Sequence, residues 1–282
     1  MQLPLVGYIL TKDEEDKIET AVRSLRRVTD VVVVVDSCST DRTAEVAEAA
    51  GATVWHHPFE SFAKQRNWAL DEIATTLSPE WIFALDADEV LDDALVEDLN
   101  RRLDNGGLDA DLYLVHRRVK FDGRLLRWGG FANTRVARLH RTGRARYEDR
   151  PVNEHLSLLV GSPTGTLEGA IVHADVSSWE RYIEKHNRYS TLEAEVRLQV
   201  AHGVRGVTLG NAIRRRDLRR RWVRERLWNR APSRPALRFA QLYLLMGGIL
   251  DGRAGFRRAL FEAWQEMCTD LKVEELRSRR KG

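Results

Sequence analysis

The sequence predicts an α/β protein whose sheet is mostly parallel. Within the first 100 residues, short runs of β-branched and aromatic residues alternate with segments whose apolar residues recur at helical spacing. Acidic or turn-forming residues directly follow the second and fourth of these runs. Because ligands bind beyond the carboxyl ends of the strands in open α/β sheets, a doubly wound nucleotide-binding domain is the simplest fold that fits both observations.

The first half of the chain supplies the alternating elements. Strands are expected at residues 5–10, 31–35, 52–55 and 81–85, and helices from residue 13 or 14 and at 59–73. The run Val31–Val35 is too short for a helix and entirely β-branched, which is typical of a strand buried on both faces. Thr40 or Asp41, in the polar segment after it, can cap the next helix. Such alternation implies right-handed crossovers between parallel strands.

The pattern changes after residue 111. Strands are expected at 112–121, 135–140 and 166–173, a helix at 179–201, and helical structure beyond residue 207 that Pro232 and Pro235 interrupt. No linker-like stretch precedes these strands, so they should extend the first sheet. We therefore expect an α/β domain at residues 1–176 and a helical, basic extension at 177–282.

Composition limits the possible functions. Cys38 and Cys268 are too few for a disulfide scaffold or a metal knuckle, which favours a reducing cytoplasmic compartment, and the N-terminus lacks the basic leader of a signal peptide. The net charge is +3, but residues 1–100 hold 8 Lys and Arg against 21 Asp and Glu, whereas the remainder holds 37 against 21. The acidic half suits cation-assisted chemistry, and the basic half suits an anionic surface.

The stretch from Trp81 to Glu89 is the main functional clue. An apolar run ends there in three carboxylates, Asp86, Asp88 and Glu89, which indicates a buried strand that delivers acids to its carboxyl end. Two aspartates one residue apart can hold a divalent cation together with diphosphate oxygens. Asp86 or Asp88 could equally cap a following helix, so this motif alone leaves both interpretations open.

Several ordered segments resemble the inverting family 2 glycosyltransferases of the GT-A fold. They cover residues 5–15, 31–41, 64–67, 84–89, 139–141, 152–155, 171–173 and 247–255, and they are most similar to the branch that contains lipopolysaccharide-core β-glucosyltransferases. The resemblance implies transfer from a UDP-sugar, with UDP-glucose as the first candidate, to a lipid-linked or lipopolysaccharide-core-type saccharide acceptor. Two positions depart from the family pattern, with Asp13 in place of Asn and Cys38 in place of Gly.

The resemblance also implies a Mg²⁺ or Mn²⁺ site that neutralises the departing diphosphate. Asp88 would bind the cation directly, and Asp86 would contact the ribose or reach the cation through water. His173 would complete the site, with His140 and His155 as alternatives close by. The other interpretation of His173 is an ordinary polar residue at a strand end.

Further residues match the nucleotide-sugar contacts of the family. These candidates are Thr11, Glu14, Asp36, Lys64, Arg66, Asp86 and Gly129. Asp36 could accept a hydrogen bond from a uracil ring N–H, and Arg66 could fork onto phosphate or ribose oxygens, whereas Lys64 offers a point charge. Gly129 would let the backbone approach the sugar closely, and Trp128 could stack on it. Turn formation, helix capping, a solvated helix face and core packing are the competing explanations.

Inversion at the anomeric carbon needs a base that takes the proton of the acceptor hydroxyl. The family places this acid after the D-x-D motif, and the matching residue here is Glu154. Asp149 and Glu148 are the fallback candidates.

The segment Arg214–Arg230 carries nine arginines and two acids, interleaved with apolar residues that include Trp222 and Trp228. This composition is typical of a helix lying on an anionic membrane surface, although the same stripe could pack on the catalytic domain. A nucleic-acid partner is not expected, because the first half is acidic and nucleic-acid motifs are missing. Residues 242–250 are too few to span a bilayer, and they are expected to dip into an interface or to make a helix–helix contact. We expect a peripheral enzyme at the cytoplasmic face of the inner membrane.

Three other functions compete with this interpretation. A haloacid-dehalogenase-like phosphatase would use Asp86 as nucleophile and Asp88 as acid, but Val90 stands where that chemistry has Thr. A sugar nucleotidyltransferase would need a Gly-rich phosphate loop near the N-terminus, where Gly7 stands alone. A non-enzymatic scaffold that binds membrane or nucleic acid would leave the acids after the fourth strand unexplained. A metal-dependent inverting glycosyltransferase is therefore the favoured hypothesis.

Overall fold

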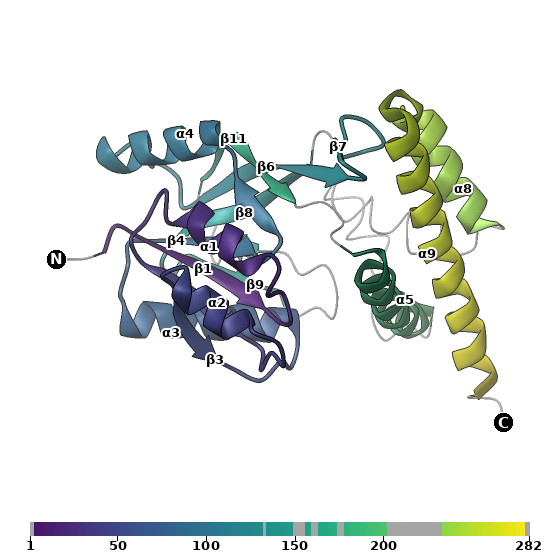
Figure 1. Ribbon diagram of the computed structural model, residues 1–282, viewed down its shortest axis with the longest axis horizontal. Helices are drawn as coiled ribbons and strands as arrows, with labels where there is room; N and C mark the ends of the chain where they lie inside the picture. Colours follow the sequence, from purple (N-terminus) through teal and green to yellow (C-terminus); the bar gives the residue numbers. More distant parts are fainter. Residues whose placement is uncertain are drawn as a thin grey trace. The chain divides into compact units, whose positions relative to one another are not determined.

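The chain divides into two compact units, each of which is described by itself. The computed structural model describes residues 3–131, 134–148, 156–158, 163–173, 178–201 and 233–279. The first unit comprises residues 1–120 and 131–175, and the second comprises 121–130 and 176–282 (Figure 1). Residues 121–130 group with the C-terminal helices, whereas the sequence predicts them within the α/β domain.

The first half of the first unit alternates between strand and helix. Its elements are β1 (Leu5–Thr11), α1 (Ile18–Leu25), β2 (Val32–Asp36), α2 (Thr43–Ala49), β3 (Thr53–His56), α3 (Phe62–Thr76) and β4 (Trp81–Asp86). Helix α1 begins later than expected, because Asp13 has a φ of 54° that a helix cannot accommodate. Helix α3 also begins late, since Ser61 Oγ accepts a hydrogen bond from Lys64 N–H at 3.2 Å and caps the helix there.

The second half adds strands of both directions. Its elements are β5 (Glu89–Leu91), α4 (Asp93–Asp104), β6 (Leu112–Phe121), β8 (Thr134–Arg141), β9 (Ala145–Tyr147), β10 (Leu156–Leu158) and β11 (Thr164–His173). The main sheet has the order β3-β2-β1-β4-β8-β6-β11-β5. Strands β3, β2, β1 and β4 are parallel, whereas β8 is antiparallel to both of its neighbours and β5 is antiparallel to β11. The α/β prediction is confirmed, although β8 interrupts the parallel order.

Two layers of helices bury the two faces of this sheet. Residues of α1, α2 and α4 pack on one face and residues of α3 on the other (Figure 1). Within β2, Val32 and Val34 join the first core while Val33 and Val35 join the second, because successive strand side chains point to opposite faces. Each fully buried valine stabilises the fold by roughly 1.5–3 kcal/mol, which explains the unbroken apolar run.

The second unit is mainly helical. It contains α5 (Trp179–Ala201), α8 (Arg234–Ala240), the π-helical turn η2 (Gln241–Leu245), the 3₁₀ turn η3 (Gly248–Asp251) and α9 (Gly252–Arg279), with the short strand β7 (Arg124–Leu125). Pro235 occupies the first turn of α8, where its missing N–H is harmless. Arg197 of α5 pairs with Glu266 at 2.7 Å and with Asp270 at 3.1 Å, and these pairs join α5 to α9. None of the described helices is both long and apolar enough to cross a bilayer.

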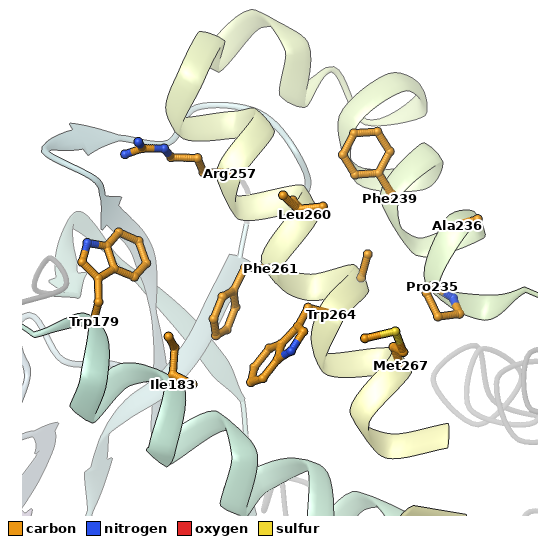
Figure 2. A pocket seen from close by; sticks show the side chains of 11 residues that line it. Trp179, Ile183, Pro235, Ala236, Phe239, Arg257, Leu260, Phe261, Trp264 and Met267 are labelled. Atoms are coloured by element: carbon orange, nitrogen blue, oxygen red, sulfur yellow. The ribbon is translucent and has the colours of Figure 1, made fainter. Parts of the chain in front are cut away.

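An apolar groove of about 940 Å³ lies among α5, α8 and α9 (Figure 2). Its lining includes Trp179 and Ile183 from α5, Phe239 from α8, and Phe261 and Trp264 from α9. A cavity of this volume and character is typical of a site for a small apolar ligand.

Candidate functional site

The carboxyl ends of three parallel strands bring the predicted nucleotide residues to one edge of the first unit. Thr11 at the end of β1 lies opposite Asp36 at the end of β2, and Leu10 of β1 lies opposite Asp86 at the end of β4. Parallel pairing places all these ends on the same side of the sheet, so residues far apart in sequence converge there. This edge is the candidate site.

Asp86 is held there by two buried arginines. Its Oδ1 accepts a hydrogen bond from Arg66 Nη2 at 2.6 Å, and its Oδ2 accepts one from Arg138 Nη2 at 2.7 Å. Burial by itself raises the pKa of Asp86, but the guanidiniums of Arg138 and Arg66 outweigh it and hold that pKa well below its usual range. Asp86 is therefore a fixed carboxylate, and its charge is paired with those of the two arginines.

Glu89 is the second carboxylate that Arg138 contacts. Arg138 Nη2 donates to Glu89 Oε2 at 2.6 Å, and Arg117 Nε lies 3.2 Å from Oε1 of the same fully buried side chain. Burial raises the pKa of Glu89 despite these cationic neighbours. Glu89 thus anchors Arg138 from beneath the site and does not face a ligand.

Strand β5 explains how Asp88 meets His173. The chain turns between β4 and β5 at Ala87 and Asp88, and β11 pairs with β5 so that His173 lies opposite Glu89. His173 Nε2 comes within 3.2 Å of Asp88 Oδ2. Burial lowers the pKa of His173, but the Asp88 carboxylate more than offsets this and the pKa is raised.

The other two candidate histidines are not part of this arrangement. His140 lies within β8 with 1% of its surface exposed, and its Nδ1 is 3.2 Å from the Arg141 carbonyl oxygen. Burial lowers the pKa of His140 to about 4, which is the behaviour of a neutral core histidine. His155 lies outside the described residues.

Asp88 and His173 supply two of the donor groups that a divalent cation needs. In the part of the chain that the structure describes, no three His, Cys, Asp or Glu side chains converge as a complete metal cluster. A hard cation takes about six ligands, so a cation here would need diphosphate oxygens and water to fill its remaining positions. The donor set fits a cation shared between protein and substrate better than a permanent structural ion.

Asp36 and Thr11, the predicted nucleotide contacts, differ in their hydrogen bonding. Asp36 accepts a hydrogen bond from Ser39 N–H at 2.9 Å, and His56 Nδ1 lies 3.2 Å from its Oδ2. The Thr11 hydroxyl is buried and makes no hydrogen bond within the described residues, which suits a group that meets a ligand. For Asp36, capping of the turn is established, and ligand contact stays a prediction.

Both departures from the family pattern lie at left-handed backbone positions. Cys38 has a φ of 59° and Asp13 a φ of 54°. Gly adopts this conformation without strain and Asn does so readily, which explains the residues that are usual at these positions. Asp13 tolerates it here because its Oδ1 accepts a hydrogen bond from Thr40 N–H at 2.8 Å.

Other predicted residues make separate contacts or fall outside the described residues. Lys64 has a 58% exposed side chain and pairs with Glu60 at 2.6 Å, and Glu14 pairs with Lys17 at 3.1 Å. Gly129 belongs to the second unit, where its N–H donates to the Met246 carbonyl at 2.9 Å. The structure describes Glu148, at the end of β9, but Asp149, Glu154 and the segment Arg214–Arg230 fall outside the described residues.

Sequence reasoning missed Arg138 and the aromatic pair that supports Arg66. The Arg66 guanidinium lies over the Tyr147 ring, 5.1 Å from its centroid, and the Tyr147 hydroxyl is 3.3 Å from that of Tyr8. Asn67 fixes β9 to α3 through hydrogen bonds of 3.0 and 2.9 Å with the Tyr147 backbone. An arginine between apolar strand residues was the available signal for Arg138, whereas nothing local marks the tyrosines.

Comparisons with known proteins identify the family of this chain. The sequence profile of Glycosyl transferase family 2 matches residues 8–159. The lipopolysaccharide core biosynthesis glycosyltransferase LpsC of Rhizobium meliloti is 31% identical over 208 residues, which cover 70% of this chain and 73% of LpsC. A glycosyltransferase of Rickettsia bellii is 38% identical over 93 residues, or 33% of this chain and 30% of that protein. Residues 1–349 of S. aureus TarS, solved with UDP, are 17% identical with a TM-score of 0.46, covering 98% of this chain and 92% of that one.

Proposed function

Because this chain belongs to glycosyltransferase family 2, we propose that it moves a sugar from a UDP-sugar, with UDP-glucose as the first candidate, to a lipid-linked or lipopolysaccharide-core-type saccharide. The observation that carries this proposal is the convergence of Asp86, Asp88 and His173 with two buried arginines at the carboxyl edge of a GT-A-type sheet. A diphosphate needs positive charge to depart, and a divalent cation held at this edge would supply it.

The residues of this edge would divide the binding of the donor between them. Thr11 and Asp36 lie where β1 and β2 end and would contact the base. Asp86 would accept a hydrogen bond from a ribose hydroxyl, because each carboxylate oxygen keeps a lone pair besides the one that its arginine uses. Arg66 orients Asp86 and would attract the phosphates. Glu14, Lys64 and Gly129 stay predicted contacts of the nucleotide-sugar.

Asp88 and His173 would hold the Mg²⁺ or Mn²⁺ ion together with the diphosphate. Such a cation, when bound, neutralises the charge that develops on the leaving group. The two residues would fix the place of that charge, since Asp88 directly precedes β5, His173 ends β11, and these two strands pair. Glu154 would take the proton from the acceptor hydroxyl as the oxygen attacks the anomeric carbon.

The phosphatase alternative is disfavoured by the environment of Asp86. That mechanism requires a strongly nucleophilic carboxylate oxygen, whereas each oxygen of Asp86 accepts a hydrogen bond from an arginine. Two bound guanidiniums also withdraw electron density from the oxygens, which lowers their nucleophilicity.

A lipid-linked acceptor agrees with the apolar groove of the second unit. Its lining offers hydrocarbon contacts that a free sugar could not use (Figure 2). The Arg214–Arg230 segment would add attraction to an anionic membrane surface, with the enzyme at the cytoplasmic face of the inner membrane.

UDP binding tests the proposed site. Calorimetric titration of UDP, with and without Mn²⁺, should show that the cation tightens binding to the wild type and to Asp93→Ala, an exposed carboxylate on α4. Asp88→Ala should lose that enhancement. The same UDP affinity in all three proteins, whether or not Mn²⁺ is present, would refute the cation site.

Turnover tests the proposed base separately. Glu154→Gln should bind UDP-glucose as the wild type does, yet release no UDP in the presence of a truncated lipopolysaccharide core. Retained turnover in this variant would remove Glu154 from its role and direct attention to Glu148 and Asp149.

A further inference from the structure

The second unit carries an exposed apolar patch at the turn between η2 and η3. Leu245 is 82% exposed there, and its neighbours in the patch are also exposed, namely Leu244, Met246, Ile249, Leu250 and Phe256. Large exposed side chains that lie together on a surface mark an interaction site, whereas isolated ones do not.

A network of backbone contacts holds this patch in one shape. The buried Asp251 carboxylate accepts hydrogen bonds from the backbone N–H groups of Arg127, at 3.1 Å, and Trp128, at 2.8 Å. The Trp128 ring lies against Gly247, so closely that a Cβ atom at this glycine would be 3.2 Å from Trp128 Cε3. Half-exposed Trp128 therefore borders the leucines and extends the patch.

Three arginines lie near the patch: Arg127 precedes Trp128, Arg253 follows η3, and Arg124 Nη1 would be 3.4 Å from a Cβ atom at Gly252. Arg124, Arg127 and Arg253 are exposed, and none of them forms an ion pair with a carboxylate in the described part of the chain. Other arginines of the same unit are neutralised, since Arg257 pairs with Asp122 at 2.7 Å and Arg238 pairs with Glu262 at 2.9 Å. The surroundings of the patch are thus selectively cationic.

We propose that this patch docks on an anionic lipid bilayer and is the structured membrane contact of the protein. The exposed leucines match the apolar interior of a bilayer, and Trp128 beside them matches its interface. The unpaired arginines match the charged headgroups. The η2 and η3 turns are too short to cross the membrane, so the contact is confined to one leaflet.

The charges favour a bilayer over a second copy of the chain. Two copies that met through this patch about a twofold axis would bring both sets of arginines together, and like charges across an interface oppose association. This proposal rests on the proposed function in one respect, namely that the acceptor is linked to a membrane lipid. The residues of the patch are different from those of Arg214–Arg230.

Vesicle sedimentation with the full-length protein tests the proposal. The vesicles would contain phosphatidylcholine alone or phosphatidylcholine with phosphatidylglycerol. Leu245→Ser should lower the partition coefficient on the mixed vesicles about tenfold, because one inserted leucine contributes that much. The matched control is Leu271→Ser, which replaces a 57% exposed leucine of α9 outside the patch and should change partitioning less than about twofold.

A charge variant examines the cationic border. Arg127→Gln combined with Arg253→Gln should reduce partitioning about twentyfold on the mixed vesicles and barely affect it on phosphatidylcholine, since each arginine near anionic lipid contributes roughly fivefold. UDP binding, measured without vesicles, should stay unchanged in every variant. A failure of the proposed function would instead show in UDP binding and leave vesicle binding intact.

Two results would overturn the proposal. In the first, Leu245→Ser partitions onto the vesicles as the wild type does, while a variant with Arg214, Arg215 and Arg216 changed to Gln no longer binds them. This result would assign the membrane contact to that arginine segment alone. The other is a change from dimer to monomer in Leu245→Ser, by light scattering, with vesicle binding unaffected, which would make the patch a subunit interface.

Discussion

Arg138 Nη2 lies 2.7 Å from Asp86 Oδ2, although 52 positions separate the two residues in the sequence. Strand β8 runs antiparallel beside β4, so the arginine reaches the strand end where the predicted D-x-D motif begins. The same nitrogen lies 2.6 Å from Glu89 Oε2. Arg138 therefore contributes both to the stability of the sheet, through Glu89, and to the charge around Asp86.

We predict that Arg138→Met destabilises the fold by about 3 kcal/mol, because it leaves the buried Glu89 and the partly buried Asp86 with one cation fewer. Urea denaturation at pH 7 measures this loss. Arg42→Met is the matched control, since its pair with Glu45 is largely exposed and should contribute less than about 1 kcal/mol. Adding Glu89→Leu to Arg138→Met should restore part of the stability, and a further loss in that double variant would contradict the explanation.

Gly169→Ala should destabilise the first unit by more than its backbone conformation alone explains. Gly169 has a φ of 78°, and a Cβ there would lie 2.2 Å from Leu95 N and 2.6 Å from Asp92 Oδ1. Asp92 caps α4, so the added methyl group would displace the cap as well as overpack the contact. We expect about 3 kcal/mol or more in urea denaturation.

Gly143→Ala separates the two causes in that experiment. Gly143 has a similar φ of 74°, but a Cβ there would meet nothing within 4 Å. Only the left-handed conformation is then penalised, by about 1 kcal/mol. Equal losses in the two variants would show that crowding at Gly169 is unimportant.

Stability should fall below neutral pH partly because of His140. Its folded-state pKa of about 4 is below the value of about 6.5 for an unfolded histidine, so the unfolded chain binds the proton more readily as pH falls. The stabilisation from the neutral His140 is complete above pH 6.5 and is lost as the pH falls from 6.5 to 4. At pH 5 the loss amounts to about 2 kcal/mol.

His140→Leu isolates this term. The free energy of unfolding, compared between pH 7 and pH 5, should decline less in the variant than in the wild type by about 2 kcal/mol. Parallel pH profiles for the two proteins would mean that His140 is accessible to protons in the folded state.

His173→Gln should weaken Mn²⁺-dependent UDP binding about 10-fold to 100-fold while leaving metal-free UDP binding unchanged, if His173 shares the cation with Asp88. Titration calorimetry measures both affinities. His116→Gln, on β6, is the control and should behave as the wild type. Identical behaviour of the two variants would exclude His173 from the cation site.

Much of the first unit follows from short-range patterns. The runs that became β1, β2 and β4 are apolar and β-branched or aromatic, and each ends in a polar residue, so both the strands and the edge they share could be predicted. The family motifs predict that Asp86, Asp88 and His173 belong to one site, and His173 Nε2 lies 3.2 Å from Asp88 Oδ2. Local sequence is informative here because the parallel strands align their ends regardless of how the rest of the sheet is built.

What escaped prediction depends on contacts between distant segments. Strand β5 has three residues and too little pattern to be recognised, yet its pairing with β11 brings His173 to Asp88. Arg138 lies among apolar strand residues, but only the pairing of β8 with β4 shows that it reaches Asp86. The assignment of residues 121–130 to the second unit rests on hydrogen bonds to Asp251, more than 120 positions away, which no window of sequence reveals.

The buried Asp251 carboxylate has a consequence for how this architecture can be inherited. The Asp251 carboxylate binds the backbone of Arg127 and Trp128. The helical unit therefore includes a short segment whose sequence lies between two parts of the sheet unit. A recombination event that joined the catalytic half of one relative to the helices of another at residue 176 would leave that carboxylate facing a foreign loop. Viable chimeras should therefore exchange residues 121–130 together with the C-terminal helices.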